Sequence, residues 1–125
     1  MLIASERDAG ALDAAIADDD DIAIAAVTAA ELLVGIELAD RRRRRARTSF
    51  VEELLGSLPI VEYGLETARA HARLLAVTRR AGRPRGAHDL IIAATAVEAG
   101  RIIVTADARG FAELPGVDVR VLGSS

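Results

Sequence analysis

The sequence lacks cysteine, lysine and tryptophan, and each absence excludes a class of chemistry. Without cysteine there is no disulfide bond, no thiolate zinc site and no thiol nucleophile. All 16 basic residues are arginine, which excludes lysine nucleophiles and the P-loop NTPases. Aromatic residues make up 2% of the chain, too few for base-stacking platforms. With only two histidines, any metal site must be built from carboxylates.

The remaining composition is that of a folded domain. The chain has 125 residues, of which 51% are hydrophobic and 28% charged, so we expect a single domain over residues 1–125. The net charge of −3 argues against a strongly basic coat for nucleic acid. No apolar run approaches the roughly 18 residues that a membrane span needs, and residues 1–8 lack the charged start and long apolar stretch that are typical of a leader peptide. We therefore expect a cytoplasmic protein with no membrane partner.

Short apolar runs alternate with longer amphipathic segments along the chain. The pattern predicts strands at 22–27, 60–63, 102–105 and 117–122, and helices at 1–20, 28–39, 41–56, 65–81, 89–100 and 109–114. Strands that alternate with helices in this way are typical of an α/β fold, in which helices cover both faces of a parallel sheet.

Three acidic residues are expected to meet at one edge of that sheet. In a right-handed βαβ unit, strand ends and helix starts share the same edge. Glu31 lies four residues after Val27, in the first turn of its predicted helix, and Asp107 lies three residues after Val104. Asp89 begins the helix that returns the chain to the start of the next strand. Doubly wound folds place their ligand sites at this carboxyl edge.

Each acid also has an ordinary structural interpretation. Thr28 and Glu31 match a capping box, and Asp89 and Asp107 are acids at helix starts. The N-terminus of a helix stabilises a nearby carboxylate by only about 0.3–1 kcal/mol. Two carboxylates about 4 Å apart repel each other by roughly 4 kcal/mol at an effective dielectric near 20. A tight cluster therefore needs a cation. Carboxylate oxygens without cysteine or histidine favour Mg²⁺ or Mn²⁺, and such ions suit phosphodiester hydrolysis.

Three motifs in this order resemble a known family. They are VTAAELLVG at 27–35, AHDLIIAATA at 87–96 and IVTAD at 103–107, followed by Phe111. Together they resemble the PIN-domain ribonucleases and, more narrowly, the VapC toxins of bacterial VapBC toxin–antitoxin pairs. The resemblance implies a PIN-like three-layer α/β/α fold with a short parallel sheet. It also implies an Mg²⁺-dependent endoribonuclease that cleaves tRNA or rRNA, forms a homodimer and is inhibited by a VapB-like antitoxin.

The resemblance assigns roles to individual residues. Asp89 is implied as the chief metal ligand, while Glu31 and Asp107 bind the metal directly or through water and orient the nucleophile. Thr105 matches the polar residue that lines the site. These four positions are the predicted centre of the active site.

The sequence departs from the family at its start. Family members begin with a strand that ends in an Asp-Thr-Ser-like motif, before a helix that resembles Leu2–Ser5. This chain starts just after that strand, so we expect a sheet without its first, central strand and a site without its first aspartate. A start codon assigned too late, a fragment, or replacement by Asp8, Asp13 or Asp18–Asp21 are the alternatives. An inactive PIN remnant that binds antitoxin or RNA is the alternative function. A phosphoryl-transfer relative, such as a receiver or an aspartyl-phosphate phosphatase, would also gather acids at this edge, but such proteins normally use a lysine, and this chain has none.

Basic residues supply the remaining candidates. Arg83 and Arg85 lie in the loop that runs into Asp89 and are expected to bind substrate. The run 41–45, with Arg47, is either an RNA-backbone contact or a solvated helix face. His88 adjoins Asp89, but a lone histidine there is weak evidence for a catalytic base.

Overall fold

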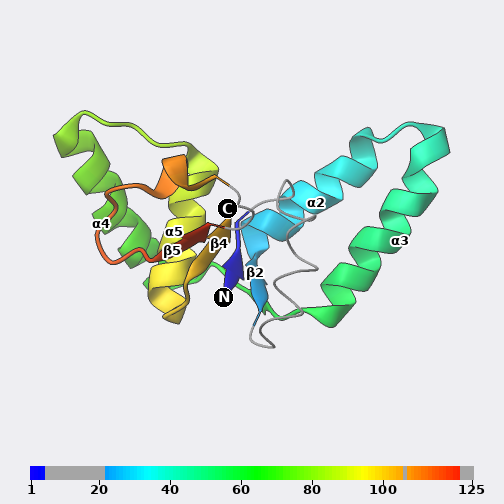
Figure 1. Ribbon diagram of the computed structural model, residues 1–125, viewed down its shortest axis with the longest axis horizontal. Helices are drawn as coiled ribbons and strands as arrows, with labels where there is room; N and C mark the ends of the chain where they lie inside the picture. The colour runs from blue at the N-terminus through cyan, green and yellow to red at the C-terminus, as the bar shows by residue number, and fades with distance from the viewer. Residues whose placement is uncertain (5–21, 106, 122–125) are drawn as a thin grey trace.

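The computed structural model describes residues 1–4, 22–105 and 107–121 (Figure 1). A parallel five-stranded sheet has the order β3-β2-β1-β4-β5. The elements are β1 (Leu2–Ile3), β2 (Ala23–Ala25), α2 (Ala26–Leu38), α3 (Arg41–Ser57), β3 (Ile60–Val61), α4 (Leu65–Ala81), α5 (Ala87–Ala99), β4 (Ile103–Thr105), the 3₁₀ helix η2 (Ala108–Phe111) and β5 (Val119–Val121). The predicted α/β architecture is confirmed.

The centre of the sheet differs from the prediction. Residues Leu2–Ile3 form β1, which pairs with β2 on one side and β4 on the other. Both the expected helix at this point and the expected absence of a central strand are therefore wrong. As a strand, these two apolar residues form backbone hydrogen bonds with a neighbour on each side and become fully buried. This stabilises them more than a helix would. The proposed substitutes Asp8, Asp13 and Asp18–Asp21 lie outside the described residues.

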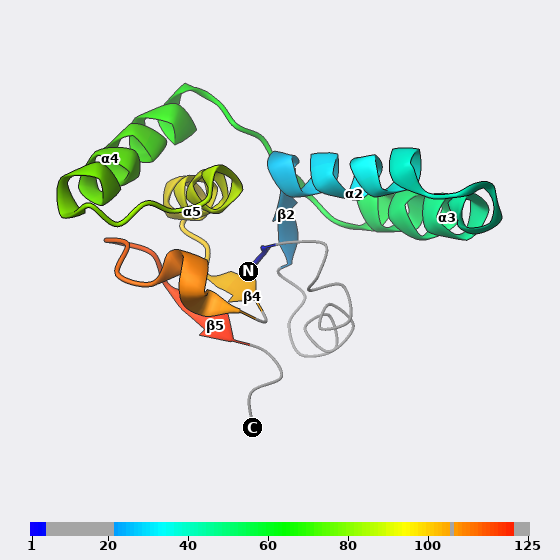
Figure 2. The same ribbon diagram turned by 90° about the horizontal axis from the view of Figure 1, so that it is seen from above.

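The sheet separates two apolar layers. Leu2 belongs to the cluster shared with α4, α5 and η2, whereas its neighbour Ile3 belongs to the cluster shared with α2 and α3. This alternation follows from the period of two in a strand. Figures 1 and 2 show α4 and α5 together on one side and the α2–α3 pair on the other. The molecule therefore has the predicted three-layer α/β/α arrangement.

Helices α2 and α3 form a hairpin, here called the arm, that projects away from the sheet (Figures 1 and 2). Asp40 caps α3 by accepting a hydrogen bond from Arg43 N at 2.9 Å. The Arg44 guanidinium donates to the carbonyl oxygens of Ile36 at 3.3 Å and Glu37 at 2.9 Å. Arg44 thus caps the last turn of α2 and closes the hairpin.

The helices behind the sheet end where the sequence predicts. α4 spans the predicted range 65–81 and is followed by Gly82 at φ 66°, and α5 is followed by Gly100 at φ 65°. Glycine is favoured at both positions because they adopt the left-handed conformation. Of the helices in the described ranges, none has both the length and the apolar character that crossing a membrane requires.

Candidate active site

Thr28 attaches the start of α2 to the centre of the sheet. Because α2 begins at Ala26, Glu31 lies in its second turn instead of the predicted first, and the N-cap forms no side-chain hydrogen bond. The predicted capping box is therefore absent. The Thr28 hydroxyl, 1% exposed, instead lies 3.2 Å from the Ala4 carbonyl oxygen and 3.5 Å from that of Ile3. This contact places Glu31 near the carboxyl end of β1.

Glu31 reaches across to the start of α5. Its Oε1 lies 2.8 Å from Nδ1 of His88, and the two side chains are 26% and 61% exposed. His88 is the second residue of α5 and Asp89 the third. The contact therefore brings the carboxylate of α2 beside the first turn of α5. His88 positions Glu31, which is a role that its place in the sequence did not indicate.

Asp89 is packed closely between two glycines. A Cβ atom added at Gly110 of η2 would lie 2.2 Å from Asp89 Oδ2, and one added at Gly86 would lie 3.5 Å from the same atom. Within the described residues this partly buried carboxylate has no hydrogen-bond or ion-pair partner. Buried charges are normally paired or bound to a metal. The environment of Asp89 therefore favours a cation.

Asp107 caps η2 and forms an exposed ion pair. Its Oδ1 accepts from Arg109 N at 3.0 Å and from Arg109 Nε at 2.9 Å, while Oδ2 lies 2.6 Å from Arg109 Nη2. The hydrogen bond from Arg109 to Asp107, and then the carboxylate charge, raise the pKa of Arg109. The Arg109 side chain is 91% exposed, so water screens this pair. Asp107 can therefore exchange Arg109 for another cation.

Thr105 shapes the turn that carries Asp107. The buried Thr105 hydroxyl accepts from Asp107 N and donates to Asp107 O, both at 3.1 Å. These bonds hold Asp107 directly beyond the end of β4. Thr105 thus holds the backbone of Asp107 in place. Its contact with substrate stays a prediction.

These contacts connect the three predicted acids through neighbouring residues. Glu31 touches His88, Asp89 follows His88, and Gly110 joins Asp89 to the helix that Asp107 caps. In residues 1–4, 22–105 and 107–121, however, no three His, Asp or Glu side chains lie close enough to hold one ion. Metal binding by these acids stays a prediction. Their oxygen donors fit Mg²⁺ or Mn²⁺.

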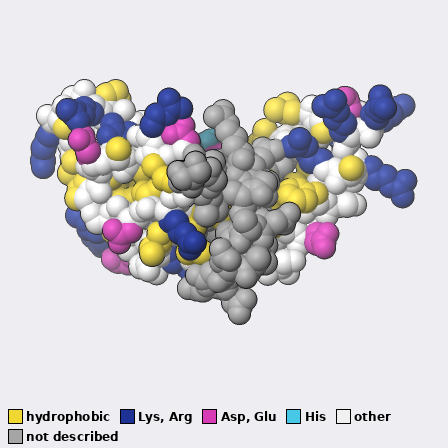
Figure 3. Space-filling view, in the orientation of Figure 1, with side chains coloured by type: hydrophobic (Ala, Val, Ile, Leu, Met, Phe, Trp, Pro, Cys, Tyr) yellow, Lys and Arg dark blue, Asp and Glu magenta, His cyan; other side chains and the backbone are white. Residues whose placement is uncertain are grey.

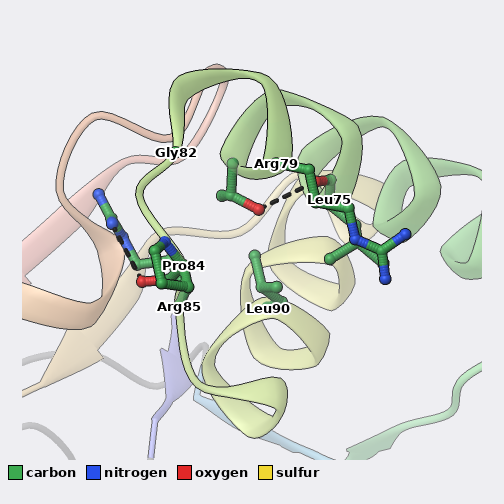
Figure 4. Close-up of a pocket in the computed structure, with 7 residues that line it drawn as sticks. Leu75, Arg79, Gly82, Pro84, Arg85 and Leu90 are labelled. Atoms are coloured by element: carbon green, nitrogen blue, oxygen red, sulfur yellow. Dashed lines mark hydrogen bonds between the residues drawn. The ribbon is translucent and has the colours of Figure 1, made fainter.

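Arg83 and Arg85 both bind the segment after η2. Arg83 forms an ion pair with Glu113, and Arg85 Nη2 donates to the Ala112 carbonyl oxygen at 2.7 Å. Figure 4 shows Arg85 beside Pro84 at a cavity of about 300 Å³ between α4 and α5. The cavity is lined by Leu75, Thr78, Arg79, Gly82, Pro84, Arg85 and Leu90. Both arginines therefore join the loop before Asp89 to the segment that follows η2. Their contact with substrate stays a prediction.

Sequence reasoning overlooked two residues of this site, Arg109 and Gly110. Both belong to the run Asp107–Phe111, in which the family motif identifies only Asp107 and Phe111. A glycine three residues after a predicted metal ligand was the available signal, since glycine permits close backbone approach.

Comparisons with known proteins agree with this geometry. The PIN domain family matches residues 1–117. Ribonuclease VapC1 of Rickettsia felis is 26% identical over 102 residues, covering 81% of this chain and 76% of that protein. VapC ribonuclease Y4jK of Sinorhizobium fredii is 33% identical over 100 residues, covering 77% and 71%. The tRNA(fMet)-specific endonuclease VapC of Salmonella typhimurium is 29% identical over 96 residues, covering 77% and 71%.

Solved structures show the same fold. VapBC-5 of Mycobacterium tuberculosis, a toxin–antitoxin system, aligns with a TM-score of 0.69 and 32% identity over 80% of this chain and 79% of that one. DNA-bound VapBC of Salmonella typhimurium aligns with a TM-score of 0.80 and 23% identity over 93% and 86%. The chain therefore belongs to the PIN-domain family. Its curated relatives within that family are VapC ribonucleases.

Proposed function

We propose that this protein is the toxin of a type II toxin–antitoxin pair and a metal-dependent endoribonuclease. The observation that carries the proposal is the partly buried Asp89 carboxylate, which has no partner within the described residues and lies against Gly110. Relatives named ribonuclease and tRNA(fMet)-specific endonuclease support RNA as the substrate. The reaction is hydrolysis of an RNA phosphodiester, in tRNA or rRNA.

Asp89 would hold Mg²⁺ or Mn²⁺, with Glu31 and Asp107 as further ligands, directly or through water. When bound, such an ion polarises the phosphodiester and lowers the pKa of a water molecule. The chain's own groups prepare the site: His88 holds Glu31 and Gly110 leaves room for the Asp89 carboxylate. Asp107, which pairs with the exposed Arg109, would be a further ligand, and Arg109, Arg83 and Arg85 would supply positive charge for the phosphate.

The proposed partners are a VapB-like antitoxin and a second copy of the chain. Support comes from the family, since the solved structures that share the fold include VapBC complexes. The proposed place of action is the cytoplasm, where tRNA and ribosomes are found. Co-purification with an antitoxin and a dimer mass by light scattering test both partners.

Changing Asp89→Asn tests the function. The substitution removes the charge and keeps the shape, so we expect calorimetric Mn²⁺ binding to disappear and tRNA cleavage to fall by about 100-fold or more. Asp118→Asn is the matched control, because Asp118 is an exposed acid before β5 and its substitution removes the same charge. Cleavage by Asp89→Asn at the wild-type rate would exclude Asp89 from the mechanism.

An inactive PIN remnant that binds antitoxin or RNA is the second candidate. It is favoured by the absence of a three-acid group among the described residues and by the pairing of Asp107 with Arg109. The same titration discriminates the two, because the remnant would bind RNA or antitoxin without Mn²⁺-dependent heat or cleavage.

A further inference from the structure

The outer end of the arm carries a dense group of arginines. The first five residues of α3 are Arg41, Arg42, Arg43, Arg44 and Arg45, all exposed. Figure 3 shows basic side chains gathered at this outer end. The chain as a whole has a net charge of −3. Other exposed arginines lie along α4, but 41–45 is the longest basic run in the sequence.

Most of these arginines have no role in the fold. Arg44 caps α2, but the side chains of Arg41, Arg42, Arg43 and Arg45 form no hydrogen bond or ion pair with any described residue. The first turn of α3 contains no acid. Positive charge at a helix N-terminus opposes the macrodipole, and like charges four residues apart repel. The four unpaired arginines therefore act against helix stability. We call them the arm patch.

We propose that the arm patch binds the phosphate backbone of the RNA substrate, an inference that rests on the proposed function. Guanidinium groups bind phosphate through paired hydrogen bonds, and the backbone of RNA needs charge but no apolar contact. A nearby hollow of about 400 Å³, lined by Gly35, Leu38, Ala39, Asp40, Arg43 and Arg47, gives the strand a place beside the patch.

The surface fits RNA better than an acidic protein. Protein interfaces centre on apolar and aromatic anchors with a polar rim, but residues 41–47 contain no apolar side chain larger than Ala46. The exposed apolar residues of the arm are Leu33, Val34 and Leu38 of α2 and Phe50 farther along α3. Of these four, Leu38 lines the hollow beside the patch, and a single leucine does not make an apolar interface core. With almost no aromatic residues, the contact is to the backbone and not to stacked bases.

The position of the arm patch also suits a substrate held at the acids. From Glu31 to Leu38, α2 rises by about 10 Å at 1.5 Å per residue, and the patch follows directly after the turn at 39–40. An RNA strand rising about 3.4 Å per nucleotide would span this distance in three or four nucleotides. The arm patch would therefore hold the flank of an RNA whose scissile phosphate lies at Asp89.

The test replaces the arm patch in the full chain with Arg41→Gln, Arg42→Gln, Arg43→Gln and Arg45→Gln together. Glutamine keeps the helix propensity of arginine. Binding of a fluorescein-labelled single-stranded RNA of 20 nucleotides is followed by anisotropy in EDTA, across a range of KCl concentrations. We expect at least tenfold weaker binding at 100 mM KCl. The slope of log K against log salt should fall by about 3, since each lost contact removes about 0.7.

The matched control removes four exposed arginines of α4 by Arg69→Gln, Arg73→Gln, Arg79→Gln and Arg80→Gln. Its net charge equals that of the arm variant, and we expect RNA affinity within about twofold of wild type. Circular dichroism checks folding, and the melting temperature of the arm variant should equal or exceed that of wild type. Equal loss in both variants, unchanged affinity of the arm variant, or no RNA binding by wild type would overturn the proposal.

Cleavage kinetics in Mn²⁺ separate this proposal from the proposed function. If wild type cleaves RNA, the arm variant should show a raised KM and an unchanged kcat, because the patch does not touch the scissile phosphate. Cleavage with an unchanged KM in the arm variant would contradict RNA binding by the arm patch and would leave the proposed ribonuclease activity standing. If RNA binding depends on the arm patch but the wild-type protein does not cleave RNA, the result would support RNA binding by the patch and contradict the proposed ribonuclease activity.

Discussion

At the scale of single residues, Asp89 depends on how closely the backbone of η2 approaches it. The space beside its carboxylate exists only because position 110 has no side chain. No positive φ requires glycine there, since the left-handed glycines described are Gly82, Gly100 and Gly116. Gly110 is therefore needed for space and not for backbone conformation.

Gly110→Ala should damage the site more than the fold. The new Cβ would lie 2.2 Å from Asp89 Oδ2, the mobile end of a side chain, so Asp89 rotates away at little cost in stability. We expect Mn²⁺ affinity to fall by about tenfold, which corresponds to about 1.4 kcal/mol, with a melting temperature within a few degrees of wild type. Calorimetric titration and thermal unfolding measure the two effects.

Gly56→Ala is the control for that prediction. Gly56 lies in the last turn of α3, one residue before its end, and an added Cβ meets nothing within 4 Å. Alanine in a helix interior stabilises by about 0.5–1 kcal/mol relative to glycine, and we expect a smaller gain at this position near the helix end, while Mn²⁺ affinity stays that of wild type. Equal Mn²⁺ affinity in both variants would show that Gly110 does not position Asp89.

Thr28→Val tests the contact between α2 and the sheet. Valine has nearly the same shape but cannot donate to the Ala4 carbonyl oxygen, 3.2 Å from the hydroxyl in the buried site. We expect a loss of about 1–2 kcal/mol in the free energy of unfolding by urea. In Thr48→Val, the hydroxyl lost donates to the carbonyl oxygen of Arg44 within its own helix, and the change should be below about 0.5 kcal/mol. Similar losses in the two variants would contradict a special role for Thr28.

At the scale of elements, the arm is attached to the body by few buried contacts. Val51 is the buried residue of α3, with Leu54 and Leu55 partly buried beside it. The cluster on this face joins Val51 to Leu32 of α2 and Ile24 of β2. Most of the rest of α3 is exposed. The arm can therefore carry charge for binding while one apolar stripe holds it in place.

Val51→Ala should loosen the arm. Val51 is 2% exposed, and removing two methyl groups with the resulting cavity should lower the free energy of unfolding by about 2 kcal/mol. Phe50→Ala removes a larger side chain from the next position, but Phe50 is 46% exposed, so a smaller loss is expected. Urea denaturation compares the two. A larger loss for Phe50→Ala would show that the arm packs differently.

At the scale of the whole molecule, the two ends serve different purposes. The acids of α2, α5 and the turn after β4 lie toward the carboxyl edge of the sheet. The run of five arginines lies at the far end of the arm, which is one of the two ends of the molecule where Figure 3 shows basic side chains. A polyanion bound at the acids is repelled unless a cation and basic groups compensate. The proposed arm patch and the proposed metal site would therefore support the same activity from separate places.

Much of this arrangement was visible in the sequence. Helix α4 and the glycines after α4 and α5 follow from periodicity and turn preference. The alternation of strands and helices also placed Glu31, Asp89 and Asp107 near one edge, because parallel topology leaves little choice about which end of a strand meets a helix start. Their joint binding of a metal awaits the titration described above.

Only the tertiary structure decided the contacts on which the site depends. Leu2–Ile3 became the central strand because β2 and β4 offered ladders on both sides, a gain that no local periodicity records. The pairing of Glu31 with His88 and the approach of Gly110 to Asp89 join segments more than 20 residues apart. Local pattern determines which elements form and which ends they share, whereas the packing of distant elements determines which atoms touch.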